Sequence, residues 1–382
     1  MRLYAPAGTV EVLDRLLNDR VVADALVDHR ILPARAADLR PFPTWLDGRI
    51  VGALRRRGIE CLYVHQADAL DALREGHDIV VVTPTASGKS LCYDLPVLQA
   101  LADDPAARAL YLFPTKALSQ DQLAGFRELA RDAQLELAAA VYDGDTPAPV
   151  RSTIRSAGQL VVTNPDMLHA AILPHHTKWF QLFEQLRFVV VDEAHTYRGV
   201  FGSHVANVLQ RLERLCAHYG SRPQIICCSA TIGNPRALAE TLTGRTVTVV
   251  DRNGAPAGEK HVVVLNPPVT DQRLGVRAGA LGLARRAALA FLRGGRQTIV
   301  FGRSRVGVEL LLSGLREALR EGRGPLHRVR GYRGGYLPSE RRAIETGLRS
   351  GEILGVVSTN ALELGIDVGR LDVAVLAGYP GT

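Results

Sequence analysis

The chain has 382 residues, of which 47% are hydrophobic and 22% are charged, and these values are ordinary for a globular protein of about two domains. No run of about 18 apolar residues is present, which excludes a membrane-spanning helix. The charged start MRLYAPAGTVEVLDRLLNDR lacks the apolar segment of a signal peptide, so we expect a cytoplasmic protein without a membrane partner; its net charge is +7.

Residues 1–50 contain Pro33, Pro41 and Pro43 and are expected to form a helical N-terminal extension with a loose connector. Short apolar strands then alternate with helix-length segments over residues 51–250. The predicted strands are 78–83, 109–114, 137–143, 159–164, 188–193 and 224–230. They are continuous apolar runs, which is typical of a parallel sheet covered on both faces. The sequence therefore predicts a doubly wound α/β domain.

The segment VVTPTASGKS carries the first chemical signal, because an apolar strand passes into a loop of small residues and then into a helix. Backbone N–H groups of such a loop bind phosphate, Lys89 adds a positive charge and Ser90 can hold Mg²⁺. The strict P-loop pattern has Gly where this chain has Thr83, although the flanking strand and helix are as required. We predict a nucleotide site formed by Thr85, Ala86, Ser87, Gly88, Lys89 and Ser90.

The segment FVVVDEAH delivers Asp192 and Glu193 to the carboxyl end of a strand, which is the edge where ligands bind in such sheets. We predict that Asp192 holds Mg²⁺ and that Glu193 orients and deprotonates the attacking water. Adjacent His175 and His176 are not predicted to bind a metal, because neighbouring histidines do not readily face one ion and no Cys or acidic cluster accompanies them.

The five cysteines lie in no C-x-x-C pair, and their number is odd. They are Cys61, Cys92, Cys216, Cys227 and Cys228. We predict neither a disulfide framework nor a zinc site. Cys227 and Cys228 belong to the apolar strand QIICCSA and are expected to be buried.

The segment DRNGAPAGEK, residues 251–260, is predicted to be a linker. A second α/β pattern follows over residues 261–382, with strands at 261–265, 297–302, 353–359 and 372–377 and helices at about 277–293 and 304–321. Residues 296–350 contain twelve Arg and five Glu with no Lys or Asp, an excess equal to the net charge of the whole chain. Such a block suits a polyanionic partner, but Arg outnumbers Lys along the entire chain, so charge alone leaves nucleic-acid binding open.

The motifs TPTASGKS, FPTKAL, TNPDML, DEAH, CSATIGNP and STNALELGID, in this order, resemble the motif series of a superfamily-two helicase. Longer stretches such as LYVHQADAL, TNPDMLHAAILPHH, FGSHVANVLQRL and VVSTNALELGIDVGRLDVAVLAGYPGT resemble the Hrq-type DEAH-box DNA helicases, a RecQ-related group that includes the MrfA and SftH proteins. The resemblance covers about residues 55–382. It implies two RecA-like domains, the second incomplete, with ATP and Mg²⁺ between them.

The resemblance also implies roles for residues at matching positions. Gln66 would read adenine, because an amide can pair with the N6 and N7 edge of that base. His195 would act with Lys89 and the two acids, and with Ser229 and Thr231 it would couple the nucleotide to the DNA side. Gly365 and Asp367 would approach the nucleotide from the second domain.

One strand of DNA is the partner that the resemblance implies. The loops implied to hold its phosphates contain Pro114, Thr115, Lys116, Thr163, Asn164, Arg303, Ser304, Ser358, Thr359 and Asn360. Backbone N–H, hydroxyl and cationic donors of this kind contact phosphate without reading base sequence.

In the same helicases an arginine finger lies in a Q-x-x-G-R-A-G-R helix shortly after a GYPGT turn, and this sequence ends at that turn with Thr382. The resemblance thus implies a chain cut before this motif and before the family's cysteine-containing C-terminal domain. We expect the 382 residues to bind ATP but to hydrolyse it poorly. The whole protein would be a monomeric 3′ to 5′ DNA helicase in DNA repair.

Two other readings are left open by the residues themselves. An RNA helicase shares the same ATPase core. A truncated gene product that binds nucleotide or DNA without turnover is the alternative of another class, although the intact Lys89, Asp192 and Glu193 argue against decay of the core.

Overall fold

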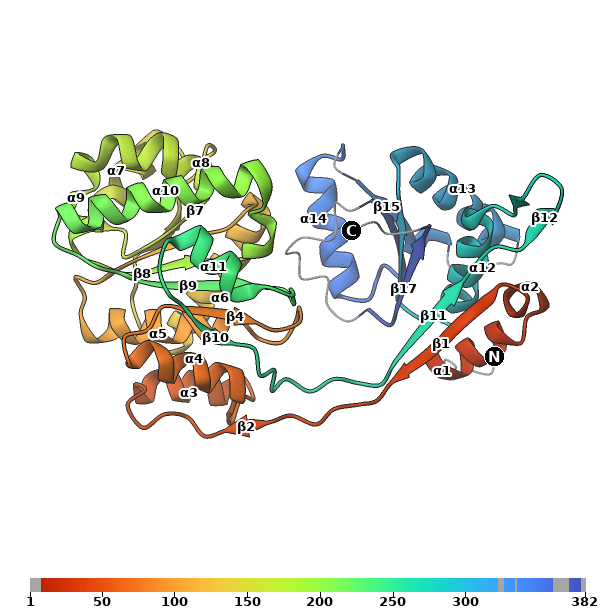
Figure 1. Ribbon diagram of the computed structural model, residues 1–382, viewed down its shortest axis with the longest axis horizontal. Coiled ribbons are helices and arrows are strands. Elements are labelled where there is room, and N and C mark those ends of the chain that lie inside the picture. Colours follow the sequence, from red (N-terminus) through yellow and green to blue (C-terminus); the bar gives the residue numbers. More distant parts are fainter. Residues whose placement is uncertain (1–7, 322–325, 334, 360–370, 379–382) are drawn as a thin grey trace. The chain divides into compact units, whose positions relative to one another are not determined.

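The computed structural model describes residues 8–321, 326–333, 335–359 and 371–378, and they form two compact units. One unit runs from Ala34 to Gly258. The other combines the described residues up to Pro33 with those from Glu259 onward, so the chain passes between the units twice (Figure 1). None of the helices in the described ranges is both long and apolar enough to cross a membrane.

The unit of residues 34–258 is built on a seven-stranded parallel sheet. Its strands, in spatial order, are β10 (Thr248–Val250), β4 (Ile79–Val82), β9 (Gln224–Ser229), β8 (Leu186–Val191), β5 (Arg108–Leu112), β7 (Leu160–Thr163) and β6 (Ala139–Val141). The six strands predicted from apolar runs are all present. Strand β10 is an additional one, formed by the β-branched segment TVV at the edge of the sheet.

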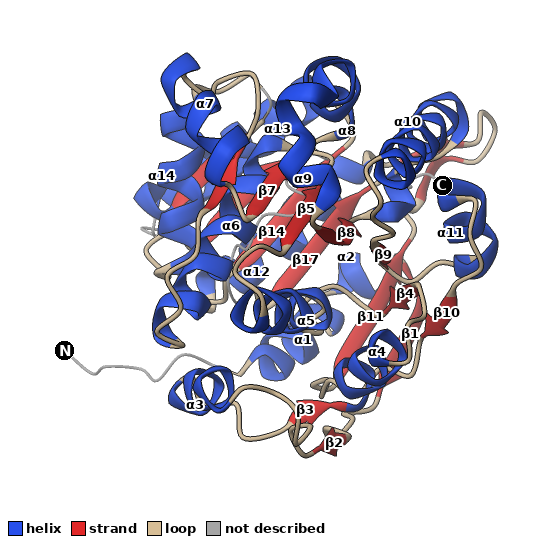
Figure 2. Cartoon of the chain, turned by 90° about the vertical axis from the view of Figure 1, so that its left-hand side faces the viewer, coloured by secondary structure: helices blue, strands red, loops and turns tan. Residues whose placement is uncertain are grey.

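Helices cover both faces of this sheet, as continuous apolar strands require (Figure 2). The first core contains α3 (Gly48–Arg56), α4 (Val64–Arg74), α5 (Ser90–Asp103) and α6 (Lys116–Asp132). The second contains α7 (Ala148–Ala157), α9 (Phe180–Glu184), α10 (Gly199–His218) and α11 (Pro235–Thr243). The short elements β2 (Leu39–Arg40), β3 (Leu62–Tyr63), α8 (Pro165–Met167), η1 (Leu168–Ile172), η2 (Leu173–Trp179) and η3 (Ala194–Thr196) complete the unit.

The other unit contains a smaller parallel sheet, with four strands among the described residues. Their spatial order is β15 (Val329–Tyr332), β16 (Gly355–Ser358), β14 (Thr298–Gly302) and β17 (Val373–Ala377). The accompanying elements are α12 (Ala280–Arg293), α13 (Arg305–Glu321), η4 (Leu326–Arg328), α14 (Pro338–Arg349) and the hairpin of β12 (Val269–Asp271) and β13 (Val276–Arg277). Strand β15 lies in the arginine-rich block, where no apolar run signals a strand.

The N-terminal segment differs from the predicted helical extension. Helices α1 (Thr9–Leu17) and α2 (Arg20–Ala23) are followed by strand β1 (Leu26–Leu32), which pairs antiparallel with β11 (Lys260–Leu265). Strand β11 therefore belongs to this ribbon and not to the parallel sheet, and its side chains alternate between exposed and half-buried. Leu13 and Leu16 of α1 pack with Phe291 of α12, which makes the segment part of the second unit's core.

Candidate functional site

The loop between β4 and α5 has the backbone geometry of an anion site. Ala86 and Gly88 have positive φ angles of 61° and 80°, and left-handed residues within such a loop are typical of anion-binding nests. A Cβ at Gly88 would also lie 2.8 Å from Nε2 of Gln66, so that amide would have to move away from the loop. Helix α5 starts directly after the loop at Ser90 and adds the positive end of its dipole.

Thr83, which replaces the expected Gly, is a structural part of this loop. It is fully buried, and its Oγ1 lies 2.6 Å from Oγ of Ser87, so the two hydroxyls join the ends of the loop. The Nζ of Lys89 donates to the carbonyls of Thr83 and Pro84, each at 2.9 Å. Thr83 in place of Gly is thus compatible with a closed loop in which the ammonium of Lys89 is held by the loop carbonyls.

Gln66 contacts the same loop through one end of its amide and the N-cap of its own helix α4 through the other. Its Nε2 donates to the carbonyl of Gly88 at 2.9 Å, and its Oε1 accepts from the backbone N–H of Tyr63 at 2.9 Å. The side chain is only 2% exposed. Gln66 therefore lies beside the predicted nucleotide loop, but an adenine would have to compete for its amide with these two protein partners.

Asp192 and Glu193 follow β8 at the carboxyl edge of the sheet, beside β9 and one strand removed from the loop after β4. Oδ1 of Asp192 accepts from the backbone N–H of Glu193 at 2.7 Å, and its Oδ2 lies 3.1 Å from the hydroxyl of Tyr93. Glu193 has a φ of 50°, an uncommon conformation for a residue other than Gly that is concentrated at functional sites.

The electrostatics of this acidic pair favour a cation. Burial raises the pKa of Asp192 to about 6, and the neighbouring Glu193 adds to the shift. Burial also raises the pKa of Glu193. A cation beside the two carboxylates would offset both effects. No cluster of three or more His, Cys, Asp or Glu side chains that could hold a metal occurs in the described part of the chain.

His195 explains why one oxygen of Glu193 has no donor. Nδ1 of His195 accepts from the backbone N–H of Ala230 at 3.3 Å. Burial lowers the pKa of this imidazole and so favours the neutral ring, and the N–H that Nδ1 accepts makes Nδ1 the nitrogen without a proton. Oε2 of Glu193 lies 3.3 Å from the same nitrogen and is buried without a hydrogen-bond partner. A buried carboxylate oxygen lacking a donor is suited to accept a proton from water, and Asp192 beside it suits Mg²⁺.

The predicted coupling residues lie next to this group. Ser229 is the last residue of β9 and is fully buried, and its hydroxyl donates to the carbonyl of Ala230 at 2.8 Å. His195 thus connects the loop of Glu193 to the segment after Ser229 through that one backbone N–H. Thr231 follows with an exposed side chain.

The residues predicted to hold DNA phosphates differ in how exposed their side chains are and in whether other protein groups already bind them. Thr115 is the N-cap of α6, and Lys116 is exposed, with its Nζ 2.7 Å from Oδ2 of Asp145. Oδ1 of Asn164 accepts from the backbone N–H of Met167 at 2.8 Å as the N-cap of α8. Thr163 is 1% exposed and its hydroxyl donates to Tyr142, so its side chain does not reach solvent. Pro114 is half-buried beside Thr115.

In the other unit, Arg303 and Ser304 are exposed at the end of β14. Ser358 is fully buried and its hydroxyl donates to the carbonyl of Thr359 at 2.7 Å, so a contact with phosphate would have to come from its backbone. Asn360, Gly365 and Asp367 lie outside the described residues.

The arginine-rich block is less available to a polyanion than its composition indicates. Arg316 donates to the carbonyl of Val329 at 3.1 Å, and Arg328 donates to the carbonyl of Glu352 at 2.8 Å. Arg333 forms an ion pair with Glu309 at 3.1 Å. Arg316 and Arg328 keep their charge in these bonds but have fewer free donors, and Glu309 offsets the charge of Arg333, so the sequence count overstates what the block offers a ligand.

Two residues of the site were not singled out from the sequence. In the sequence Thr83 is a departure from the P-loop pattern, and Tyr93 belongs to no motif. Tyr93 lies among the apolar residues of α5 and is fully buried, with its hydroxyl directed at the acidic pair. A tyrosine three residues after Gly-Lys-Ser, within an apolar helix, was the signal available, because a buried hydroxyl requires a partner.

Comparison with known proteins identifies the family. The model for DEAD/DEAH box helicases matches residues 63–238, and that for the helicase conserved C-terminal domain matches residues 284–382. The chain is 54% identical over 370 residues to the uncharacterised ATP-dependent helicase YprA of Bacillus subtilis, covering 97% of the chain and 49% of that protein. It is 38% identical over 377 residues to the ATP-dependent helicase HRQ1 of Saccharomyces cerevisiae, covering 97% and 35%.

A solved structure of the DUF1998 helicase MrfA bound to DNA and AMPPNP is similar over 98% of this chain, with a TM-score of 0.93 and 53% sequence identity. The match covers 51% of the MrfA chain. The chain therefore spans about half the length of YprA and MrfA, and about a third of HRQ1.

Proposed function

Because this chain belongs to the DEAD/DEAH-box helicases of superfamily two and is closely related to YprA, MrfA and HRQ1, we propose that it binds Mg·ATP at the β4–α5 loop. Lys89 and the loop N–H groups would hold the phosphates, and Ser90 and Asp192 would hold Mg²⁺. The observation that carries the proposal is the buried Asp192–Glu193 pair, which contains one carboxylate oxygen without a donor. Mg²⁺ would supply charge neutralisation at the phosphates.

We further propose that the whole protein uses ATP to move along single-stranded DNA. This is supported by the DNA bound to the related MrfA and by the positions of Thr115, Lys116 and Asn164 at the carboxyl edge of the sheet. A 3′ to 5′ direction, a role in DNA repair, a monomeric state and a cytoplasmic location belong to the same proposal and rest on the resemblance to this family.

Nucleotide binding is tested with a fluorescent ATP analogue and Mg²⁺. Lys89→Ala should lower the affinity roughly ten- to hundredfold, because it removes charge-assisted hydrogen bonds to phosphate. Lys178→Ala, at an exposed lysine of the same unit, is the matched control. Wild-type affinity in the Lys89 variant would refute the site.

DNA binding is tested by the anisotropy of a labelled single strand at several salt concentrations. Affinity should fall steeply with salt, and a single-stranded RNA of the same sequence should bind more weakly. Lys116→Ala should weaken binding and reduce the salt slope by about the share of one phosphate. Asp145→Ala removes the protein partner of Lys116 and should not weaken binding. Equal or tighter RNA binding would favour an RNA helicase.

Weak hydrolysis by the 382 residues stays a prediction. It is tested by DNA-stimulated ATPase of residues 1–382 beside a longer chain that includes the arginine motif of this family. Equal rates would contradict it.

A further inference from the structure

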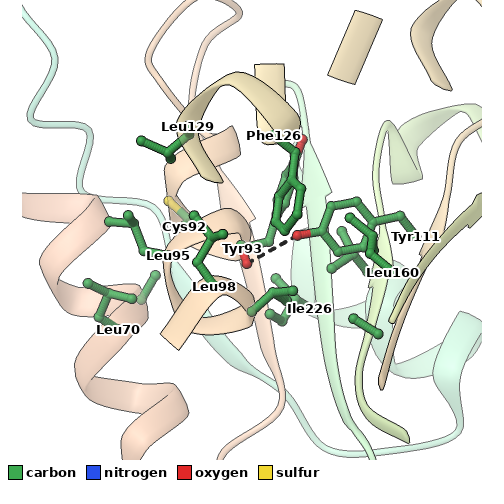
Figure 3. Close-up of a cluster of buried hydrophobic side chains, with 14 of the residues drawn as sticks. Leu70, Cys92, Tyr93, Leu95, Leu98, Tyr111, Phe126, Leu129, Leu160 and Ile226 are labelled. Atoms are coloured by element: carbon green, nitrogen blue, oxygen red, sulfur yellow. Dashed lines mark hydrogen bonds between the residues drawn. The ribbon is translucent and has the colours of Figure 1, made fainter. Parts of the chain in front are cut away.

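Tyr93 connects the acidic pair to a helix that begins at the proposed DNA surface. Its hydroxyl lies 3.1 Å from Oδ2 of Asp192 and 3.1 Å from Oε1 of Gln122 in α6. The ring is fully buried and packs edge-on against Tyr111, with ring centroids 5.2 Å apart at an angle of 83°. Figure 3 shows the two tyrosines inside the core of the sheet, close to Phe126 of α6.

A hydroxyl has one proton and therefore donates to one of two acceptors at a time. Oδ1 of Asp192 already accepts the N–H of Glu193, so Tyr93 holds the second oxygen and fixes the rotation of the carboxylate. A cation at Asp192 would draw electron density from Oδ2 and make it a poorer acceptor. The hydroxyl would then favour Gln122.

Helix α6 can carry such a change to its first turn. Leu118, Leu123 and Phe126 are each 1–3% exposed and anchor the helix in the core. The same helix is capped by Thr115 and begins at Lys116, six residues before Gln122. Small shifts of a packed helix are transmitted along its length because packed cores do not deform freely.

We propose that Tyr93 is a positioning residue that fixes Asp192 for Mg²⁺ and couples cation occupancy there to the DNA-contacting turn of α6 through Gln122. This inference rests on the proposed function, since it assumes Mg·ATP at Asp192 and a DNA strand at Thr115 and Lys116.

The test uses Tyr93→Phe in the 382-residue chain and measures binding. Two quantities are determined: the Mg²⁺ concentration that half-saturates binding of the fluorescent ATP analogue, and the ratio of single-stranded DNA affinities with and without Mg·AMPPNP. Tyr93→Phe should raise the half-saturating Mg²⁺ concentration by about tenfold, the effect of one lost hydrogen bond to a charged group. It should also move the affinity ratio toward one, while DNA affinity without nucleotide stays unchanged.

Two further variants separate this role from a general effect on the core. Tyr111→Phe removes a neighbouring buried hydroxyl that bonds to Asp94 at 3.1 Å, so it should leave both quantities unchanged. Gln122→Met keeps the size of the side chain and removes the acceptor, so it should move the affinity ratio toward one and raise the half-saturating Mg²⁺ concentration less than Tyr93→Phe does.

Wild-type values for both quantities in Tyr93→Phe, or equal shifts in Tyr111→Phe, would overturn the inference. If the 382-residue chain itself shows no Mg²⁺-dependent nucleotide binding, the proposed function fails together with it.

Discussion

Asp94 offers a pH-dependent test of how the ATP-binding unit is built. Its carboxyl is 6% exposed beneath the acidic pair, and Oδ1 accepts from the hydroxyl of Tyr111 at 3.1 Å. Burial raises the pKa of Asp94 from 3.8 to about 8. The folded protein thus holds this proton over a pH range in which the unfolded chain has lost it.

The difference between the folded and unfolded pKa of Asp94 sets the sign and size of its effect on the free energy of unfolding. A carboxyl whose pKa is higher in the folded state contributes stability that is greatest at low pH, declines as pH rises above the unfolded value of 3.8 and is fully lost above about 8. One pH unit within that window corresponds to about 1.4 kcal/mol. Between pH 6 and pH 8 the ionisation of Asp94 should therefore lower the free energy of unfolding by about 2 kcal/mol.

The assay is urea unfolding of wild type and Asp94→Asn at pH 6 and pH 8. Both tryptophans of the chain, Trp45 and Trp179, belong to the unit of residues 34–258, so their fluorescence reports this unit. In wild type the free energy of unfolding should fall between pH 6 and pH 8. In Asp94→Asn this fall should be smaller by about 2 kcal/mol, because the amide does not ionise. Asp71→Asn, at an exposed carboxylate, should leave the loss unchanged. Equal losses in wild type and Asp94→Asn would refute the reasoning.

Two further predictions use the same fluorescence assay at constant pH. A Cβ at Gly202 would lie 2.4 Å from the carbonyl oxygen of Tyr197, so Gly202→Ala should destabilise the unit by about 1–3 kcal/mol, whereas Gly125→Ala meets no atom within 4 Å and should stabilise it by up to about 1 kcal/mol. Arg245 is 10% exposed and pairs with Oε1 of Glu213 at 2.9 Å and Oδ2 of Asp78 at 3.3 Å, so Arg245→Met should cost about 3–5 kcal/mol by leaving both acids without their cation. Restoration of much of this loss by adding Asp78→Asn would support the cause, and a loss below 1 kcal/mol in the single variant would contradict it.

Much of the fold could be predicted because its signals are local. The strands of the larger sheet are buried on both faces and therefore appear as apolar runs. Strand β15 could not be found in this way, because its sequence VRGY contains Arg and Gly. Strands β1 and β11 pair although the whole unit of residues 34–258 separates them in the sequence. Nothing local in either segment specifies its partner.

The same difference between local motifs and contacts made by tertiary packing applies to the candidate site. The loop up to Lys89 and the acids after β8 are short motifs whose spacing carries their chemistry, and the structure brings them to one edge of a parallel sheet. The contact of Tyr93 with Asp192 depends on the packing of α5 against β8, so it emerges only in three dimensions. The burial of Thr163 and Ser358 also depends on tertiary packing, so the sequence did not predict it.

The double passage between the units has a consequence for synthesis on the ribosome. Residues 34–258 form one continuous stretch and can fold as they emerge, whereas β1 must wait for β11. At roughly 5–20 residues per second this delay is on the order of tens of seconds. During that time Leu13 and Leu16 of α1 lack Phe291, their apolar partner in α12. The apolar face of α1 therefore stays exposed until α12 has been made, and we expect chaperones to bind it during that time.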